Sequence, residues 1–368
     1  MSSIPATPPA GRILRTTPRV GPKIDPTSTF TALAKSVRES GLLRRARWFY
    51  AALGGGLLLA FGGAVTGFIL LGDSWFQLII AGVLGIIATQ AAFVAHEASH
   101  RQVVESGPWN DRIGRWIGTL AVGMSYQWWM TKHTRHHANP NQVDKDPDIK
   151  TDVIAFTPED AANQRGIFAI IARRQGWLFY PLLLLEGLNL HVQSVRSLTE
   201  RRPVDGRWTE IGLLTVHFAV FLGAVFWMLP LGMAFAFVGV QLAVFGVYMG
   251  TSFAVNHIGM PIIARDAKLD FFAKQVRTSR NIGGGFWASA LLGGLNYQVE
   301  HHLFPNMARP HLARTRLMVR EHSRNHDVPY TEMSIGRAHV AVIRELRRVG
   351  LAARDPFTCP LVANYRRA

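Results

Sequence analysis

Four long apolar segments, arranged as two closely spaced pairs, most constrain what this chain can fold into. The first, residues 48–72, contains no charged residue and, with a rise of ~1.5 Å per residue, would form a helix about 36 Å long. That length is enough to cross the hydrocarbon core of a bilayer. The other three are residues 75–95, 211–229 and 231–255. Only a Gly-Asp-Ser turn separates the first pair and Pro230 the second, so the sequence predicts four transmembrane helices in two hairpins.

Composition and charge support a membrane protein with a fixed orientation. The 368 residues are 48% hydrophobic and carry a net charge of +16, but the two hairpin turns contain no Lys or Arg. By the positive-inside rule, both termini and the long central region are expected in the cytoplasm, with the protein in the cell membrane. Nucleic-acid binding is not expected, because the basic residues flank the membrane segments instead of forming a face interleaved with aromatics. Those before residue 48 are Arg12, Arg15, Arg19, Lys23, Lys35, Arg38, Arg44, Arg45 and Arg47.

Three regions are predicted along the chain: a basic arm over residues 1–45, a membrane domain over 46–330 and a cytoplasmic tail over 331–368. The first ~28 residues are rich in Pro, Ser and Thr, a composition typical of disorder. Residues 177–190 are apolar but short and contain Glu186, which favours a helix lying in the membrane interface over a fifth span. The expected fold is therefore all-α, with four spans, one interfacial helix and a cytoplasmic helical cap. A single cysteine, Cys359, excludes a cysteine-based metal site within the chain.

Histidines are grouped at the expected cytoplasmic ends of the apolar segments. HEASH and HTRHH place their histidines at spacings that share one helical face, QVEHH contains an adjacent pair, and one further histidine ends the fourth segment. A single such pair on a helix is more often incidental than a metal site, but several groups on one membrane face make coincidence improbable. Eight imidazoles exceed what one zinc ion binds, so the sequence predicts a dimetal site. The eight are His96, His100, His133, His136, His137, His257, His301 and His302.

Imidazole alone does not select the metal, because it suits zinc, copper, iron and nickel. The position of the cluster, where long apolar helices end, favours a lipid chain as substrate. Activating dioxygen beside a saturated chain favours iron. His217, in the third span, is interpreted as a packed or hydrogen-bonded residue, and His311, His322, His326 and His339 are interpreted as structural.

HEASH, HTRHH and QVEHH, in this order and with one hairpin before the second box and another before the third, resemble the three histidine boxes of the integral-membrane fatty acid desaturases. The resemblance runs from about residue 46 to residue 317 and includes the phrases HANPNQVDKDPDI and NYQVEHHLFPNMARPHL. It implies a four-span enzyme with a cytoplasmic non-haem diiron centre, held by the eight histidines above. Such enzymes use dioxygen and two electrons to insert a double bond into an acyl chain.

The third box departs from the pattern of many acyl-CoA desaturases, because Gln298 stands where they have histidine. Glutamine there is the form of the branch that includes front-end and many actinobacterial acyl desaturases. Gln298 could bind metal, bind a metal-bound water, or do neither, and His191 is the alternative ninth ligand. Asn256 is a candidate for orienting a bound water. Ligating imidazoles usually donate their other N–H to an acceptor, and the candidate acceptors are Glu97, Glu300, Asp144, Asp146 and Asp148.

The substrate expected from these features is a long-chain acyl group, with acyl-CoA favoured over an acyl-lipid. Lys132, Arg135, Arg173 and Arg174 are candidates for binding a CoA head group. The chain shows neither a haem-binding motif nor a four-cysteine pattern, so electrons are expected from a separate ferredoxin or flavin-containing NAD(P)H reductase. A diiron lipid hydroxylase remains open as an alternative. A metal-binding or metal-transporting protein would have ligands along the spans, where only His217 lies.

Overall fold

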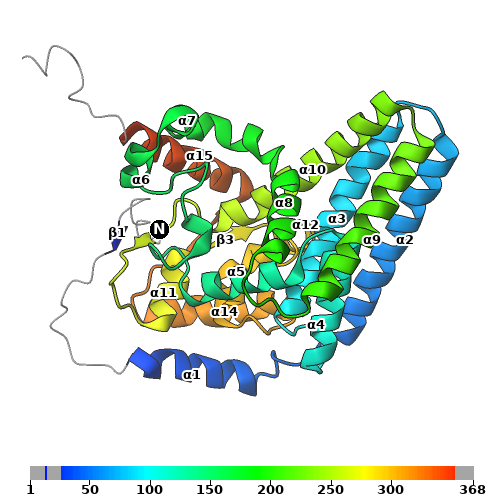
Figure 1. Ribbon diagram of the computed structural model, residues 1–368. Helices are drawn as coiled ribbons and strands as arrows, with labels where there is room; N and C mark the ends of the chain where they lie inside the picture. Colours follow the sequence, from blue (N-terminus) through cyan, green and yellow to red (C-terminus); the bar gives the residue numbers. More distant parts are fainter. Residues whose placement is uncertain (1–12, 15–25, 353–368) are drawn as a thin grey trace, which may run out of the picture.

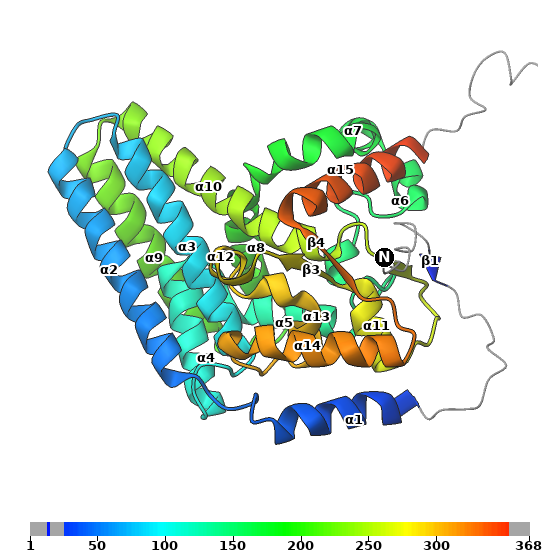
Figure 2. The same cartoon turned by 180° about the vertical axis from the view of Figure 1, so that it is seen from behind.

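The four predicted spans are present in the structure, a computed structural model that describes residues 13–14 and 26–352. Four helices in this part of the chain are long and apolar enough to cross a membrane, and each lies within a few residues of its predicted position. They pack as one bundle in Figures 1 and 2, while most of the remaining helices gather at one end of it. The spans are α2 (Arg47–Leu71), α3 (Gln77–Ser99), α9 (Arg207–Met228) and α10 (Leu231–His257).

The first hairpin turn is closed by a buried glutamine. Gln77 Nε2 donates to the carbonyl oxygens of Phe68, at 2.7 Å, and of Gly72, at 3.0 Å, and so provides donors for carbonyls at the end of α2. Pro230 precedes α10 and has no N–H to continue α9. Both hairpins are therefore ended by local sequence features.

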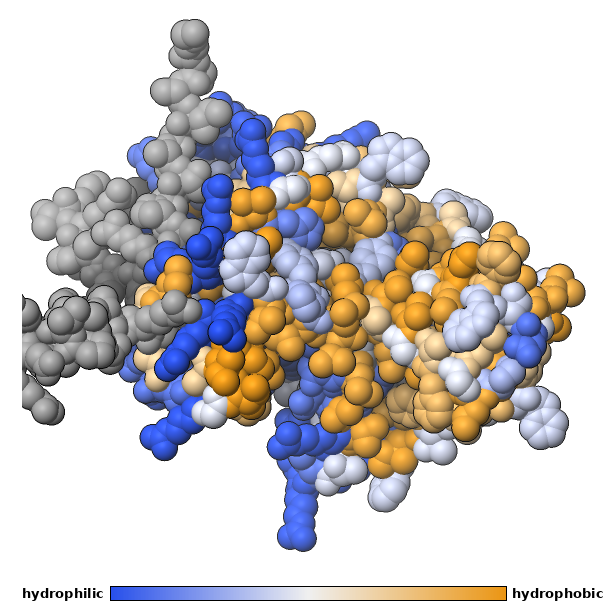
Figure 3. Space-filling model, turned by 90° about the horizontal axis from the view of Figure 1, so that it is seen from above, coloured by the Kyte–Doolittle hydropathy of each residue, from blue (hydrophilic) through white to orange (hydrophobic). Residues whose placement is uncertain are grey.

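Aromatic residues mark the ends of the bundle, and apolar side chains cover its outer surface. Trp48 and Trp208 lie near the cap end and Trp227 near the opposite end, and each is more than four-fifths exposed. Such belts of tryptophan are typical of membrane–water interfaces. In Figure 3 hydrophobic residues cover the bundle, whereas hydrophilic residues gather on the cap. The chain is an all-α membrane protein of four spans, as predicted.

The central region forms a series of helices that lead from α3 to α9. The segment predicted as a single interfacial helix, residues 177–190, is instead divided between two helices that meet at Leu184 and Leu185. Pro181 lies in the last turn of the first of these helices, where it removes one backbone donor. Large apolar side chains on both helices are exposed, as expected at a membrane surface. The helices of this region are α4 (Gly107–Arg115), the π-helix η1 (Trp116–Ala121), α5 (Tyr126–Ala138), the 3₁₀ helix η2 (Pro147–Ile149), α6 (Pro158–Asn163), α7 (Gly166–Leu183) and α8 (Glu186–Thr199).

The region after α10 completes the cap and contains short strands that the sequence did not predict. β3 (Arg280–Gly283) pairs in parallel with β4 (Thr331–Ser334), and β1 (Ile13–Leu14) pairs with β2 (Ile262–Ile263). Because β4 and the following helix pack here, the predicted tail contributes to the cap up to residue 352. Most of the segment predicted to be disordered, and Cys359, lie outside the described residues. The other elements are α1 (Pro26–Glu39), α11 (Phe271–Thr278), α12 (Gly285–Leu291), the 3₁₀ helix η3 (Leu295–Tyr297), α13 (Gln298–Leu303), α14 (Arg309–Asn325) and α15 (Ile335–Ala352).

An apolar core holds the short helices of the cap in place. Val276 of α11, Val299 of α13 and Val319 of α14 are fully buried in one cluster that also includes residues of α1. On the other side of the cap, α15 packs closely on α7: a Cβ on Gly350 would lie only 2.3 Å from the Ala172 carbonyl oxygen. These contacts set the positions of α11 and α13 relative to the cap-side end of α10.

Candidate metal centre

Four helices bring the eight predicted histidines to one place at the cap end of the spans. His96 lies in the last turn of α3, His100 directly follows that helix, and His257 is the last residue of α10. α5 contributes three histidines and α13 contributes two. The side chains form two groups of possible metal ligands, with donor atoms in each group within 4.8 Å of one another. One group contains His96, His100, His133, His137 and His301, and the other contains His136, His257 and His302.

The five-histidine group is centred on His133. Its Nε2 lies 2.9 Å from Nε2 of both His96 and His100, and 3.0 Å from Nε2 of His137. His301 Nε2 lies 3.1 Å from His137 Nε2. A neutral imidazole has one ring N–H, so five converging nitrogens cannot all be satisfied by hydrogen bonds among themselves. A cation bound by their lone pairs would resolve this conflict.

The three-histidine group has a more defined protonation pattern. Nδ1 of His136 lies 3.0 Å from both carboxylate oxygens of Asp146, and Nδ1 of His257 lies 3.0 Å from the Thr278 carbonyl oxygen. Nδ1 of His302 lies 2.9 Å from Oε1 of Gln275. Each of these oxygens only accepts, so each Nδ1 carries the proton and each neutral ring has its lone pair on Nε2. The Nε2 atoms face one another, which is the arrangement that metal binding requires.

One of these nitrogens is left without a partner. Nε2 of His302 is buried and has no hydrogen-bond partner among the described residues. Nε2 of His257 lies 3.3 Å from Nε2 of His136 and 2.9 Å from Nε2 of Gln298. A buried, unpaired nitrogen is costly unless something binds it. The donor set and the unpaired atom both fit a metal ion.

Burial keeps most of the clustered imidazoles neutral. It lowers the pKa of His100 to about 3, and it also lowers the pKa values of His133 and His301 well below the ordinary value. His136 differs: burial lowers its pKa, but Asp146 and Asp148 outweigh this effect and the pKa is raised. Neutral imidazole is the metal-binding form of histidine, so burial prepares the site for a cation.

Most of this chain matches the model of one protein family. Residues 73–334 match the family model described as fatty acid desaturase. This chain belongs to the fatty acid desaturase family. The match confirms the resemblance inferred from the three histidine motifs.

Curated relatives of the desaturase family align with most of this chain. It is 30% identical over 305 residues to a Delta(8)-fatty-acid desaturase of Helianthus annuus, covering 79% of this chain and 66% of the relative. It is 31% identical over 303 residues to Delta(8)-fatty-acid desaturase 2 of Arabidopsis thaliana, covering 79% and 67%. A Delta(6)-fatty-acid desaturase of Caenorhabditis elegans is 26% identical over 317 residues, covering 82% and 70%. The chain thus spans about two thirds of the length of these desaturases.

Two of the acidic residues considered as partners of the box histidines lie beside an imidazole. Asp146 is fully buried against His136, and Asp148 Oδ2 lies 3.3 Å from the same Nδ1. Asp144 is exposed and instead lies 3.5 Å from Arg265. The loop turns at Asp144, which has a positive φ of 62°, and this directs its side chain away from the site.

Glu97 and Glu300 do not contact the clustered imidazoles. Glu97 accepts two hydrogen bonds of 2.7 Å from Arg309, which link α3 to α14. Glu300 accepts from Asn281 at 2.6 Å and from Tyr330 at 2.9 Å, and burial raises the pKa of Glu300 to about 7. Both carboxylates therefore join the histidine-bearing helices to neighbouring elements of the cap.

The structure also separates the two alternatives for a ninth ligand. The amide of Gln298 lies beside the three-histidine group, and its Oε1 accepts a 3.2 Å hydrogen bond from Asn256. His191 lies in neither group: its Nδ1 donates to the Gly123 carbonyl oxygen at 2.8 Å, and its ring lies near His217. Because α8 faces the end of η1, the His191 side chain does not reach the boxes.

Sequence reasoning missed Gln275 and Thr278, two buried residues of α11 that orient His302 and His257. α11 contains no histidine and no carboxylate, so the motifs give no sign of it. Gln275 also donates through Nε2 to the carbonyl oxygen of His137 at 2.9 Å. A single side chain thus contacts residues of both histidine groups.

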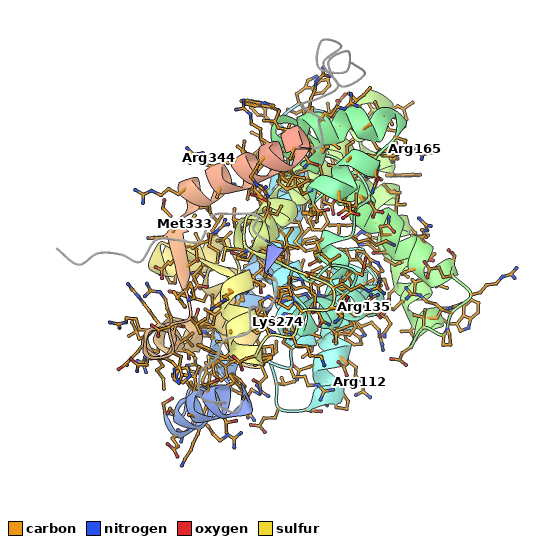
Figure 4. All side chains as sticks on the ribbon, turned by 90° about the vertical axis from the view of Figure 1, so that its left-hand side faces the viewer. Arg112, Arg135, Arg165, Lys274, Met333 and Arg344 are labelled. Carbon is orange, nitrogen blue, oxygen red and sulfur yellow. The ribbon has the colours of Figure 1, made fainter. Side chains whose placement is uncertain are left out.

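The basic residues considered for a head group have different surroundings. Lys132 pairs with Asp148 at 2.9 Å, next to the three-histidine group. Arg135, Arg173 and Arg174 are exposed. Figure 4 shows Arg135 on the face of the cap turned away from the spans, together with Lys274.

An apolar pocket lies directly beside the five-histidine group, with His96 in its wall. Its walls come from α3, η1, the loop that follows η1, α5 and α10, and most of them are apolar. The lining residues are Ala92, Ala95, His96, Gly118, Val122, Met124, Ser125, Tyr126, Trp129 and Met249.

Proposed function

We propose that this protein is a membrane desaturase that inserts a cis double bond into a long-chain acyl group at a non-haem diiron centre. The observation that carries the proposal is the convergence of two sets of buried Nε2 atoms, with Nδ1 of all three rings in one set held by acceptors. Membership of the fatty acid desaturase family supports the activity. The Delta(8) and Delta(6) positions in the names of the relatives describe those relatives only.

Each histidine group would hold one iron ion. The two ions together would supply dioxygen activation and removal of two hydrogen atoms, with two electrons and two protons from outside completing the reduction of dioxygen to two waters. His133 and its four neighbours would bind one iron, and His136, His257 and His302 the other. Gln298, beside the second group, would contact a ligand of that ion, with Asn256 holding its amide.

The residues around the apolar pocket would form part of the surface along which the acyl chain is positioned. A hydrocarbon offers no polar handle, so its position depends on the shape of the pocket. Trp129 stacks on His133, with ring centroids 4.9 Å apart, and it lines the pocket together with His96, a member of the five-histidine group. The acyl chain would pass this wall, with water excluded by the surrounding apolar side chains.

For the carrier of the acyl group, we propose a membrane lipid in place of the acyl-CoA expected from the sequence. The sequence pointed to acyl-CoA through four basic residues, but Lys132 is engaged by Asp148. The relatives include acyl-lipid (9-3)-desaturases of Borago officinalis and Physcomitrium patens. A membrane lipid would reach the bundle from the side, where apolar residues are exposed.

The orientation and the electron supply also belong to the proposal. The cap would lie in the cytoplasm, because Arg44, Arg45 and Arg47 lie at the cap end of α2 whereas the opposite turns carry no basic residue. Electrons would come from a separate ferredoxin or flavin reductase fed by NAD(P)H, reaching the cap from the cytoplasm.

The test is fatty acid analysis of cells that express the chain with a ferredoxin and its reductase. Gas chromatography with mass spectrometry of the wild type should show a new monounsaturated acid, first in the lipid fraction and later in acyl-CoA. His301→Ala should show none, whereas His326→Ala, at an exposed histidine far from the boxes in sequence, should match the wild type. Hydroxylated acids would instead indicate a hydroxylase. Absence of any new acid in the wild type, with iron and donor present, would contradict the proposal.

A further inference from the structure

Two histidines outside the metal groups hold a segment of backbone between the spans. His191 of α8 donates through Nδ1 to the carbonyl oxygen of Gly123 at 2.8 Å. His217, in the middle of α9, donates through Nδ1 to the carbonyl oxygen of Leu120, also at 2.8 Å. Their ring centroids are 6.1 Å apart. Two neutral imidazoles on two different helices therefore bond to carbonyls only three residues apart.

The segment needs such donors because its backbone is irregular. η1 is a π-helix, and after it the amides of Val122 and Met124 bond back to the carbonyls of Ile117 and Gly118. In an apolar environment a carbonyl without a donor costs free energy, and irregular backbone at membrane depth persists only where such groups are paired. His217 and His191 supply donors at Leu120 and Gly123.

The two rings also pack directly on Gly123. This residue has a φ of +82°, and a Cβ built on it would lie 2.6 Å from Nε2 of His217 and 2.9 Å from Cε1 of His191. Glycine is the residue that adopts this backbone and leaves room for both rings. Behind them, His191 stacks on Phe245 of α10 and His217 stacks on Phe221. The position of the segment is thus fixed from both sides.

The same segment forms one wall of the apolar pocket. Gly118, Val122, Met124 and Ser125 line the pocket, and they flank Leu120 and Gly123, whose carbonyls the two histidines hold. Val122 and Met124 also pack with Phe245, the ring on which His191 stacks. Any shift of the imidazoles would therefore move the pocket wall beside His96.

We propose that His191 and His217 are positioning residues that set the acyl-chain selectivity of this enzyme by fixing the pocket wall over residues 118–125. The inference rests on the proposed function, since it assumes that the pocket receives the acyl chain. It assigns a role to the two histidines that the boxes do not use. Neither residue contacts the metal groups, so iron binding is independent of this role.

The test compares leucine with asparagine at both positions. Leucine removes the donor, whereas the side-chain amide nitrogen of asparagine takes about the place of Nδ1 and still donates. Cells expressing each variant are supplied with saturated acids of several chain lengths, and the products are resolved by length and double-bond position. His191→Leu and His217→Leu should change the ratio of products by about tenfold, the discrimination that one methylene gives in an apolar pocket. His191→Asn and His217→Asn should keep the wild-type ratio.

Iron content per chain separates this role from a general loss of structure, and it should stay at the wild-type value in all four variants. If a leucine variant does not accumulate, His217→Gln keeps a donor but displaces it, and an altered product ratio is again expected. An unchanged product ratio in the folded leucine or glutamine variants would overturn the inference while leaving the proposed function intact. A wild type without unsaturated products would overturn the proposed function itself.

Discussion

Oε1 of Gln275 lies 2.9 Å from Nδ1 of His302, and Nε2 of the same side chain donates to the carbonyl oxygen of His137. One fully buried amide thus joins the three-histidine group to the helix that carries part of the five-histidine group. The contact fixes which nitrogen of His302 carries the proton. Through this residue α11, which contains no histidine, contacts both histidine groups.

Gln275→Leu should lower iron content toward one ion per chain. The substitution removes the acceptor for His302 Nδ1, so the imidazole ring is no longer held in one orientation. Loss of such a supporting hydrogen bond typically weakens metal binding by about 10-fold to 100-fold. Gln275→Glu keeps the acceptor and should retain both ions. Metal analysis of the purified proteins checks this, and full iron retention by Gln275→Leu after dialysis against a weak chelator would contradict it.

Asp146→Asn and Asp144→Asn form a matched pair in one loop. Asp146 is buried against His136, whereas Asp144 is exposed and pairs with Arg265. Asp146→Asn should lose iron from the three-histidine group and desaturation with it, while Asp144→Asn should behave as the wild type. Equal iron content in the two variants would show that the carboxylate does not support His136.

Glu97→Gln should destabilise the protein through its buried ion pair with Arg309. Both side chains are almost fully buried, and removal of one partner leaves a buried charge that costs about 3–5 kcal/mol. The double variant Glu97→Leu/Arg309→Met should recover much of that loss. Glu39→Gln, in the exposed pair with Lys35, is the control and should change stability by less than about 1 kcal/mol. The apparent melting temperature in detergent compares the stability of the three variants. If Glu97→Gln is as stable as Glu39→Gln, the Glu97–Arg309 ion pair does not stabilise the protein.

Removal of metal should lower the melting temperature of the wild type. The candidate ligands lie on or next to α3, α5, α10 and α13, so two bound ions would together link four helices and stabilise the folded state by mass action. A strong chelator should therefore lower the melting temperature of the wild type. It should leave unchanged the melting temperature of His301→Ala/His302→Ala, in which both histidine groups are incomplete. Identical shifts in the two proteins would indicate an effect unrelated to the site.

The spans and the histidine groups could be predicted from sequence because each depends on local pattern. Uncharged runs longer than a bilayer crossing specify α2, α3, α9 and α10, and spacings of three and four residues place histidines on one helical face. Topology then delivers those faces to one side of the membrane. The family resemblance rests on the same motifs, and the family match confirms it.

The rest depends on contacts between distant segments, which leave no local pattern. Nothing in the sequence indicates that Gln275 faces His302, or that Glu97 turns from the imidazoles to Arg309, 212 residues away. The strand pair β3 and β4 is equally non-local. Nor does the sequence indicate that His191 meets the carbonyl oxygen of Gly123, because that contact depends on how α8 packs on η1.

Metal analysis combined with Mössbauer spectroscopy of the purified wild type distinguishes a diiron centre from a single metal site. We expect two iron ions per chain in two different environments, one surrounded by five imidazoles and the other by three imidazoles beside Gln298. His301→Ala and His302→Ala should each lose the ion of their own group first. A single iron environment, or an active protein with one iron or none, would show that the two histidine groups do not form a diiron centre.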